Sequence, residues 1–207
     1  MTQAGIASPA PPRAEPLSWL KPAVFTGSIV PLTVLVIRAA EGKLSADPVS
    51  EMLNQFGLLA LVFLIAALAC TPLKLLFGWT WGLRIRKMLG LFGFFYALLH
   101  FLTYVVLDRQ LNMAEVISDI LRRKFIFIGF AAFVILIPLA WTSTPEAVRR
   151  MGAKKWQRLH KLAYLAAILG VVHFFMRVKV IGEEQYIYAG ILAAFLLARV
   201  LGALRRG

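Results

Sequence analysis

The sequence predicts an all-α integral membrane protein built as a bundle of six transmembrane helices. Hydrophobic residues make up 60% of the 207 positions and the mean hydropathy is +0.76, whereas soluble domains contain about 45–50% apolar residues. Six apolar stretches approach the length of about 20 residues that spans a bilayer. Lys and Arg residues gather in alternate segments between these stretches, as expected for a multi-pass protein. The single cysteine, Cys70, excludes an intrachain disulfide.

Residues 1–20 are predicted to form a disordered cytoplasmic tail. Four prolines interrupt this segment, so it lacks the apolar run of about 7–15 residues that defines a secretory signal. Trp19 and Lys21 are typical of residues that anchor a helix at the membrane surface. The membrane domain is therefore expected to begin at about residue 21.

The six expected spans follow one another at short intervals. The first is the weakest, because it contains Pro22 and Pro31 and ends at Arg38, and a five-span arrangement stays open for that reason. The predicted spans cover residues 22–37, 53–69, 88–107, 125–141, 159–176 and 186–204.

Charge predicts the orientation of the bundle. With the N-terminus in the cytoplasm, the inner segments hold 15 of the 23 basic residues and 2 of the 10 acids, which leaves 8 of each kind outside. The net charge of +13 then lies wholly on the inner side, in accord with the positive-inside rule. We therefore expect both termini in the cytoplasm. Nucleic-acid binding by the basic loops is not expected, because a soluble domain with aromatic stacking platforms is missing.

The three histidines, His100, His160 and His173, all lie in or at the edge of a predicted span, where ionisable residues are costly and usually functional. At about 1.5 Å per residue, His100 lies roughly 18 Å and His173 roughly 21 Å from the inner ends of two spans that run in the same direction. Two imidazoles at one level can hold the iron of a haem b from both faces. Each histidine alone is also consistent with a neutral imidazole bonded to a backbone carbonyl.

Arg86 and His160 mark a second polar level near the inner surface. Arg86 precedes His100 by 14 residues and shares its helix face, whereas 13 residues place His160 about 140° out of phase with His173 unless the helix is distorted near Gly170. Arg86 is equally consistent with an ordinary positive-inside charge. The sequence shows no internal repeat and no dinucleotide-binding fingerprint, so electrons would have to come from a separate protein or a membrane quinone.

Several short motifs together resemble the ferric reductase-like transmembrane domain, over roughly residues 21–205. The resemblance is closest to its compact bacterial branch, the MsrQ (formerly YedZ) family. The motifs are Thr71-Pro72-Leu73, Arg84-Ile85-Arg86-Lys87-Met88-Leu89-Gly90-Leu91, Tyr96-Ala97-Leu98-Leu99-His100, Leu139-Ala140-Trp141-Thr142-Ser143 and Trp156-Gln157-Arg158-Leu159-His160-Lys161-Leu162-Ala163-Tyr164.

The resemblance implies a non-catalytic electron-transfer subunit in a bacterial inner membrane. Members of the family are associated with haem b and FMN. They pass electrons from the quinone pool or a cytosolic flavin reductase to MsrP, a periplasmic molybdopterin enzyme that repairs oxidised methionines. His100 and His173 match the outer haem ligands of the superfamily. His160 matches an inner position and is a further candidate ligand of haem iron, whereas Arg86 stands where larger oxidases carry its histidine partner.

Two alternatives stay open at this point. The same fold also serves direct reduction of ferric iron or oxygen. A proton-coupled transporter with a histidine relay is disfavoured, because the predicted spans contain no Asp or Glu. The basic inner segments 71–87 and 142–158 are consistent with a flavin-phosphate site and, more simply, with solvated loops.

Reporter fusions test the predicted orientation. A reporter active only in the cytoplasm should be active when fused after residue 207 and inactive when inserted near Asp47, because six spans place these positions on opposite sides. A periplasmic reporter should give the reverse pattern. Cytoplasmic activity near Asp47 would mean that the first apolar stretch does not cross the membrane.

Overall fold

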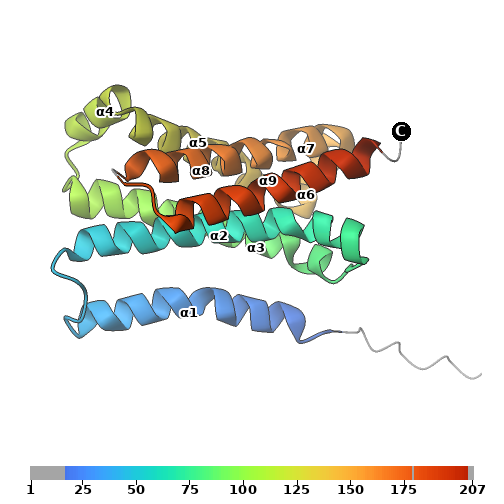
Figure 1. Ribbon diagram of the computed structural model, residues 1–207, viewed down its shortest axis with the longest axis horizontal. Coiled ribbons are helices and arrows are strands. Elements are labelled where there is room, and N and C mark those ends of the chain that lie inside the picture. The colour runs from blue at the N-terminus through green and yellow to red at the C-terminus, as the bar shows by residue number, and fades with distance from the viewer. Residues whose placement is uncertain (1–16, 179, 205–207) are drawn as a thin grey trace, which may run out of the picture.

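A computed structural model describes residues 17–178 and 180–204 as a bundle of helices, with no strand in these ranges (Figure 1). Most of the tail expected at residues 1–20 lies outside the described residues. Six helical segments are long and apolar enough to cross a membrane, which confirms the predicted all-α, six-span bundle. The helices are α1 (Leu20–Ala40), α2 (Pro48–Phe77), α3 (Gly82–Thr103), α4 (Met113–Arg122), α5 (Lys124–Trp141), α6 (Pro145–Met151), α7 (Ala153–His160), α8 (Leu162–Arg177) and α9 (Glu183–Leu204).

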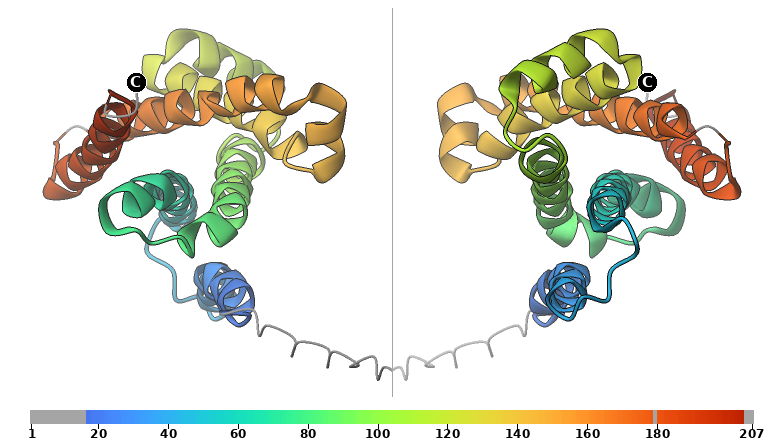
Figure 2. Two further views of the ribbon diagram at one scale, coloured as in Figure 1. Left: turned by 90° about the vertical axis from the view of Figure 1, so that its right-hand side faces the viewer. Right: turned by 90° about the vertical axis from the view of Figure 1, so that its left-hand side faces the viewer.

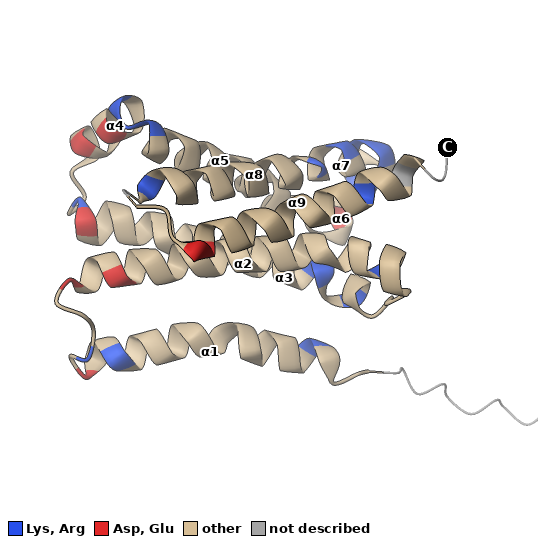
Figure 3. Ribbon diagram, in the orientation of Figure 1, with Lys and Arg blue, Asp and Glu red and all other residues tan. Residues whose placement is uncertain are grey.

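Charged residues divide the bundle into two ends, which Figure 3 shows in colour. The basic end carries α6, α7, the turn at residues 78–81 and the last turn of α9, and among the described residues its one acid is Glu146. The acidic end carries α4 and the connections 41–47, 109–112 and 178–182. It holds the other eight described acids: Glu41, Asp47, Glu51, Asp108, Glu115, Asp119, Glu183 and Glu184.

Helix α2 is longer than the predicted span at 53–69 because both of its ends are capped. At the start, the Asp47 side chain accepts a hydrogen bond from the Ser50 N–H, and Pro48 occupies the first helical position. At the end, Gly78 adopts a left-handed conformation with φ of 70°, which glycine tolerates without strain. Because its apolar stretch is 56% buried, against at most 33% in the other spans, α2 forms the centre of the bundle.

Two helix pairs, one of which includes α2, form the body of the bundle. Helix α2 packs most extensively against α3, and α5 against α8, and the end-on views in Figure 2 show α9 and α1 at the periphery. Gly93 of α3 brings the α2–α3 pair close together, since a Cβ at this position would lie 3.0 Å from the Leu64 side chain. The four paired helices leave room between them for the sites described below.

The peripheral helix α1 is fixed by one buried polar contact that the sequence did not indicate. The Tyr96 hydroxyl of α3 donates a hydrogen bond of 2.5 Å to the Ser28 carbonyl of α1. Tyr96 has 0% exposure, and its ring stacks on Phe63 of α2 at 5.4 Å. Because the membrane interior offers no water to a phenol, this bond holds α1 against α3.

We expect Tyr96→Phe to destabilise the bundle by about 1 kcal/mol, the usual net contribution of one such hydrogen bond. Thermal unfolding in detergent should show a lower Tm, with α1 more open to proteolysis. Tyr188→Phe is the matched control, because the hydroxyl of Tyr188 makes no hydrogen bond within the described part of the chain. Equal Tm values for the two variants would contradict the role given to the Tyr96 hydroxyl.

Candidate functional site

Two cavities lie between the paired helices, one toward each end of the bundle. The cavity toward the acidic end, here called the histidine-pair cavity, has a volume of about 430 Å³ and is lined by His100 and His173. The cavity toward the basic end, here called the basic cavity, has a volume of about 610 Å³ and is lined by Arg86 and His160. The structure thus separates the three histidines into two groups.

His100 is held by helix α2 through a backbone carbonyl. Its Nδ1 lies 2.9 Å from the Leu53 oxygen. One turn later, Gly57 leaves the space that the imidazole occupies, since a Cβ there would lie 3.1 Å from Nδ1. Because Cβ atoms on a helix tilt toward its N-terminus, a side chain at position 57 would cover the very carbonyl that His100 uses.

His173 is held by α5 in the same way. Its Nδ1 lies 2.7 Å from the Phe125 oxygen, and Gly129 follows that carbonyl by four residues. A Cβ at Gly129 would lie 2.7 Å from Nδ1, a distance that real Cβ contacts do not reach. The same carbonyl, glycine and histidine arrangement therefore occurs once in each helix pair.

These contacts fix the tautomer of both rings. A backbone carbonyl only accepts hydrogen bonds, so each Nδ1 carries the proton and each Nε2 keeps a free lone pair. The ring centroids are 6.1 Å apart and the rings are inclined at 80°. The described residues contain no group of three or more His, Cys, Asp and Glu side chains that could hold a metal. The two imidazoles are the side chains of this cavity whose free nitrogens face one another.

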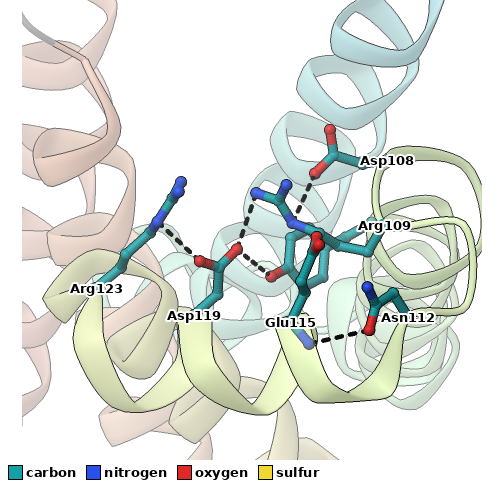
Figure 4. Close-up of polar contacts among 7 residues, drawn as sticks. Asp108, Arg109, Asn112, Glu115, Asp119 and Arg123 are labelled. Carbon is teal, nitrogen blue, oxygen red and sulfur yellow. Dashed lines mark hydrogen bonds and ion pairs between the residues drawn. The ribbon is translucent and has the colours of Figure 1, made fainter.

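Charged residues gather at one side of the histidine-pair cavity, here called its mouth, where Asp108, Arg109 and Arg123 are among the lining residues, and Figure 4 shows their contacts. Asp119 of α4 binds Arg109 at 2.8 Å and Arg123 at 2.9 Å, and it accepts a hydrogen bond from the Tyr104 hydroxyl. Contact with Tyr104, together with the Asp108 and Asp119 carboxylates, raises the pKa of Arg109. The short π-helix η1 (Tyr104–Asp108) carries Tyr104 and Asp108 and ends directly before Arg109, and π-helical turns often occur at functional sites.

A third arginine at this mouth has no acid to balance it. Arg177 lies one turn beyond His173, lines the same cavity and donates a hydrogen bond to the neutral Asn54 amide. No salt bridge of Arg177 occurs among the described residues. The mouth therefore carries one uncompensated positive charge close to the histidine pair.

The basic cavity holds His160 by side chains instead of a backbone carbonyl. The Thr142 hydroxyl donates to the Pro138 carbonyl and lies 3.1 Å from the His160 Nε2. Trp156 stacks on the imidazole at 3.9 Å and donates its indole N–H to the Thr142 carbonyl. In this arrangement Nε2 of His160 is occupied, unlike Nε2 of the other two histidines.

Comparison with known proteins identifies the family of this fold and site. The model of the family described as "Ferric reductase like transmembrane component" matches residues 30–171. The chain belongs to this family. It is also 45% identical to the protein-methionine-sulfoxide reductase heme-binding subunit MsrQ of Rhodospirillum rubrum, over 89% of this chain and 88% of that protein.

Other MsrQ proteins show similar sequence identity to this chain. Identity is 42% to MsrQ of Herminiimonas arsenicoxydans, over 94% of this chain and 89% of that protein. It is 43% to MsrQ of Deinococcus radiodurans, over 91% of this chain and 93% of that protein. The chain is thus a member of the MsrQ family, as its sequence motifs indicated. No solved structure matches it.

His160 and His173 line different cavities, as their expected difference of about 140° in helical phase predicts. The helix is interrupted at Lys161, between α7 and α8, and not near Gly170, which lies inside α8 and contacts Leu61. His160 lines the basic cavity with Arg86, whereas His173 lines the histidine-pair cavity with His100. The structure thus groups His100 with His173 and Arg86 with His160, as expected from their depths along the helices.

A wall of apolar side chains separates the two cavities of this family member. Leu64 and Leu136 line both of them. Phe94 lines the basic cavity and stacks on Phe133 at 6.0 Å, and Phe133 stacks on Phe101 at 4.9 Å in the histidine-pair cavity. Sequence reasoning named none of these aromatic residues, although the phenylalanine-rich runs 92–95 and 125–133 were a visible signal.

Proposed function

We propose that this chain holds one haem b between His100 and His173 and conducts electrons across a bacterial inner membrane. The observation that carries the proposal is the pair of facing imidazoles, each with Nδ1 anchored on a carbonyl and Nε2 free. The relatives are heme-binding subunits by name, which supports the same ligand. The chain then acts as the electron-transfer subunit of an oxidoreductase and not as its catalyst.

The residues of the histidine-pair cavity suit a bis-histidine haem. Bound there, the haem would supply one-electron chemistry at its iron. The Leu53 and Phe125 carbonyls orient the two ligands and increase their basicity. Gly57 and Gly129 give the rings room, and the apolar walls exclude water. Arg177, the uncompensated cation at the mouth, would balance the charge of a haem carboxylate.

The basic cavity is proposed as the end at which electrons enter, with the basic end and both termini in the cytoplasm. The donor would be the quinone pool or a cytosolic flavin reductase, with FMN as a further cofactor. Arg86 offers a planar fork of donors to a phosphate, carboxylate or quinone oxygen. His160 could exchange a proton there. Ligation of a second iron by Nε2 of His160 would require its hydrogen bond to Thr142 to break.

The aromatic residues between the cavities support a route through the wall. Phe94 reaches from the basic cavity to Phe133, which reaches Phe101 beside His100. Electrons would leave at the acidic end, toward a periplasmic MsrP-like molybdopterin reductase. Addition of that purified partner to the reduced protein distinguishes this role from direct reduction of ferric iron or oxygen.

Replacing either ligand should remove the haem signature. We expect His100→Ala and His173→Ala, purified in detergent, to lose most bound haem or to lose the reduced α-band of a low-spin b-type centre, because iron would keep a single axial ligand. Absorption spectra before and after dithionite measure both quantities. A full bis-histidine spectrum in both variants would refute the assignment, and the absence of any reducible b-type spectrum in the wild type would favour the transporter alternative.

Substitution of Gly129, compared with substitution of Gly190, tests the geometry of the same site without removing a ligand. Gly129→Ala should lower haem content or alter the spectrum, since the new methyl group would collide with the His173 ring at 2.7 Å. Gly190→Ala on α9 is the matched control, because a Cβ at that position would have nothing within 4 Å. Equal haem content in the two variants would contradict a role for Gly129 in seating His173.

Arg86→Ala should slow the entry of electrons at the basic cavity and leave the haem site reducible. Chemical reduction of the haem by dithionite should persist, because Arg86 does not line the histidine-pair cavity. Reduction by quinol or by a flavin reductase should slow about tenfold or more, the usual consequence of losing a charge-assisted contact. Stopped-flow spectra of the haem measure both rates, with His160→Ala tested in parallel. Wild-type rates with every physiological donor would leave Arg86 as a simple positive-inside charge.

A further inference from the structure

Arg199 of α9 is a partly buried arginine inside a membrane-spanning helix. Its Nε and Nη2 are buried and have no hydrogen-bond acceptor in the described part of the chain. Arg109 also has a buried Nε without a hydrogen bond, but that atom lies 3.4 Å from the Asp108 carboxylate. Because buried polar groups are nearly always bonded, the Arg199 nitrogens indicate a missing acceptor.

The ring of Tyr164 supplies part of the surroundings of Arg199. The guanidinium carbon lies 4.8 Å from the Tyr164 ring centroid, a cation–π contact that stabilises the charge and leaves its N–H groups free to donate. Tyr164 also lines the basic cavity. Tyr164 therefore contacts the Arg199 guanidinium and also lines the basic cavity.

A second guanidinium, that of Arg86, lines the basic cavity together with Tyr164. Its own contact is one long hydrogen bond of 3.4 Å to the Thr71 hydroxyl. The described residues give neither arginine a salt bridge, and no Asp or Glu lines the basic cavity, where Lys87 and Lys161 add further positive charge. Like charges gathered without an acid in a membrane bundle are strongly unfavourable unless an anion joins them.

We propose that Arg199 and Arg86, with the Tyr164 ring as a wall, form a binding site for a phosphate group at the basic end of the bundle. A guanidinium presents parallel N–H donors that match two phosphate oxygens. Two guanidinium groups suit a phosphate better than a carboxylate, because a phosphate monoester carries up to two negative charges and three terminal oxygens.

Two sources can supply this phosphate. One is a flavin mononucleotide seated in the basic cavity, an identification that rests on the proposed function. The other is the headgroup of an anionic lipid, which needs no electron transfer. The lipid has access from the outer side of α9, where Leu197, Val200 and Leu201 are exposed apolar residues. Basic pockets between spans commonly bind such headgroups.

The experiment compares Arg199→Gln with Arg199→Lys, which keeps the charge, in the full chain. The matched control is Arg149→Gln, an exposed arginine at the same end that pairs with Glu146. FMN and riboflavin, which lacks the phosphate, are titrated by fluorescence. Native mass spectrometry in nanodiscs containing equal amounts of phosphatidylglycerol and phosphatidylcholine measures retained lipid.

If the phosphate belongs to a flavin, FMN should bind more tightly than riboflavin. Arg199→Gln should then weaken FMN binding about tenfold, because one charge-assisted contact is lost, and should leave riboflavin binding unchanged. A lipid source predicts retained phosphatidylglycerol that Arg199→Gln loses. In either case Arg199→Lys should keep part of the binding and Arg149→Gln all of it. Ligand-free Arg199→Gln should unfold at the wild-type Tm or above, because it removes an unpaired buried charge, and this result separates lost binding from misfolding.

The proposal is overturned if Arg199→Gln changes neither FMN affinity nor retained phosphatidylglycerol. It is also overturned if the variant changes haem content alone, because a haem presents carboxylates and no phosphate. Neither outcome bears on the His100 and His173 assignment, since phosphate binding is measured without reduction of the haem.

Discussion

The hydrogen bond from each histidine Nδ1 to a helix carbonyl is the interaction on which the histidine-pair cavity depends. A carbonyl inside a helix already accepts one N–H, and its second lone pair is normally covered by the side chain one turn later. Gly57 and Gly129 remove that cover. Since lipid offers no competing water, the exposed lone pair becomes the natural partner of an imidazole, and the ring direction follows from the rigid helix.

The same arrangement of a carbonyl, a glycine and a histidine occurs in both helix pairs and relates them to each other. Leu53 and His100 are 47 residues apart, and Phe125 and His173 are 48 residues apart. Besides the glycine and the histidine, the two copies share the apolar residues Ala60 and Ala132, Val62 and Val134, Leu64 and Leu136, and Ile65 and Ile137. These matches are short and apolar, so they do not stand out in a membrane sequence, although the spacing from glycine to histidine is nearly equal in both copies.

The sequence predicted what depends on composition and on helical rise, and it missed what depends on contacts between distant residues. Hydropathy and charge were sufficient for six spans, and depth along each span was sufficient to bring His100 and His173 to one level. The break at Lys161 was not predicted, because no glycine or proline marks it. Arg199 looked like one more inner charge. Its significance depends on Tyr164, which the packing of α9 on α8 brings into contact with it, and on Arg86, which lines the basic cavity together with Tyr164.

The two cavities differ in how their polar groups are held, and this difference suits different occupants. Backbone carbonyls fix His100 and His173, so the positions of these rings do not depend on the titration or rotation of another side chain. At the other end, His160 depends on Thr142 and Trp156, while Arg86 and Arg199 carry charges that the described residues do not balance. A fixed, neutral pair of ligands suits a resident metal centre. A cavity with surplus positive charge is stabilised by whichever anion enters it, and it therefore suits a ligand that binds and leaves.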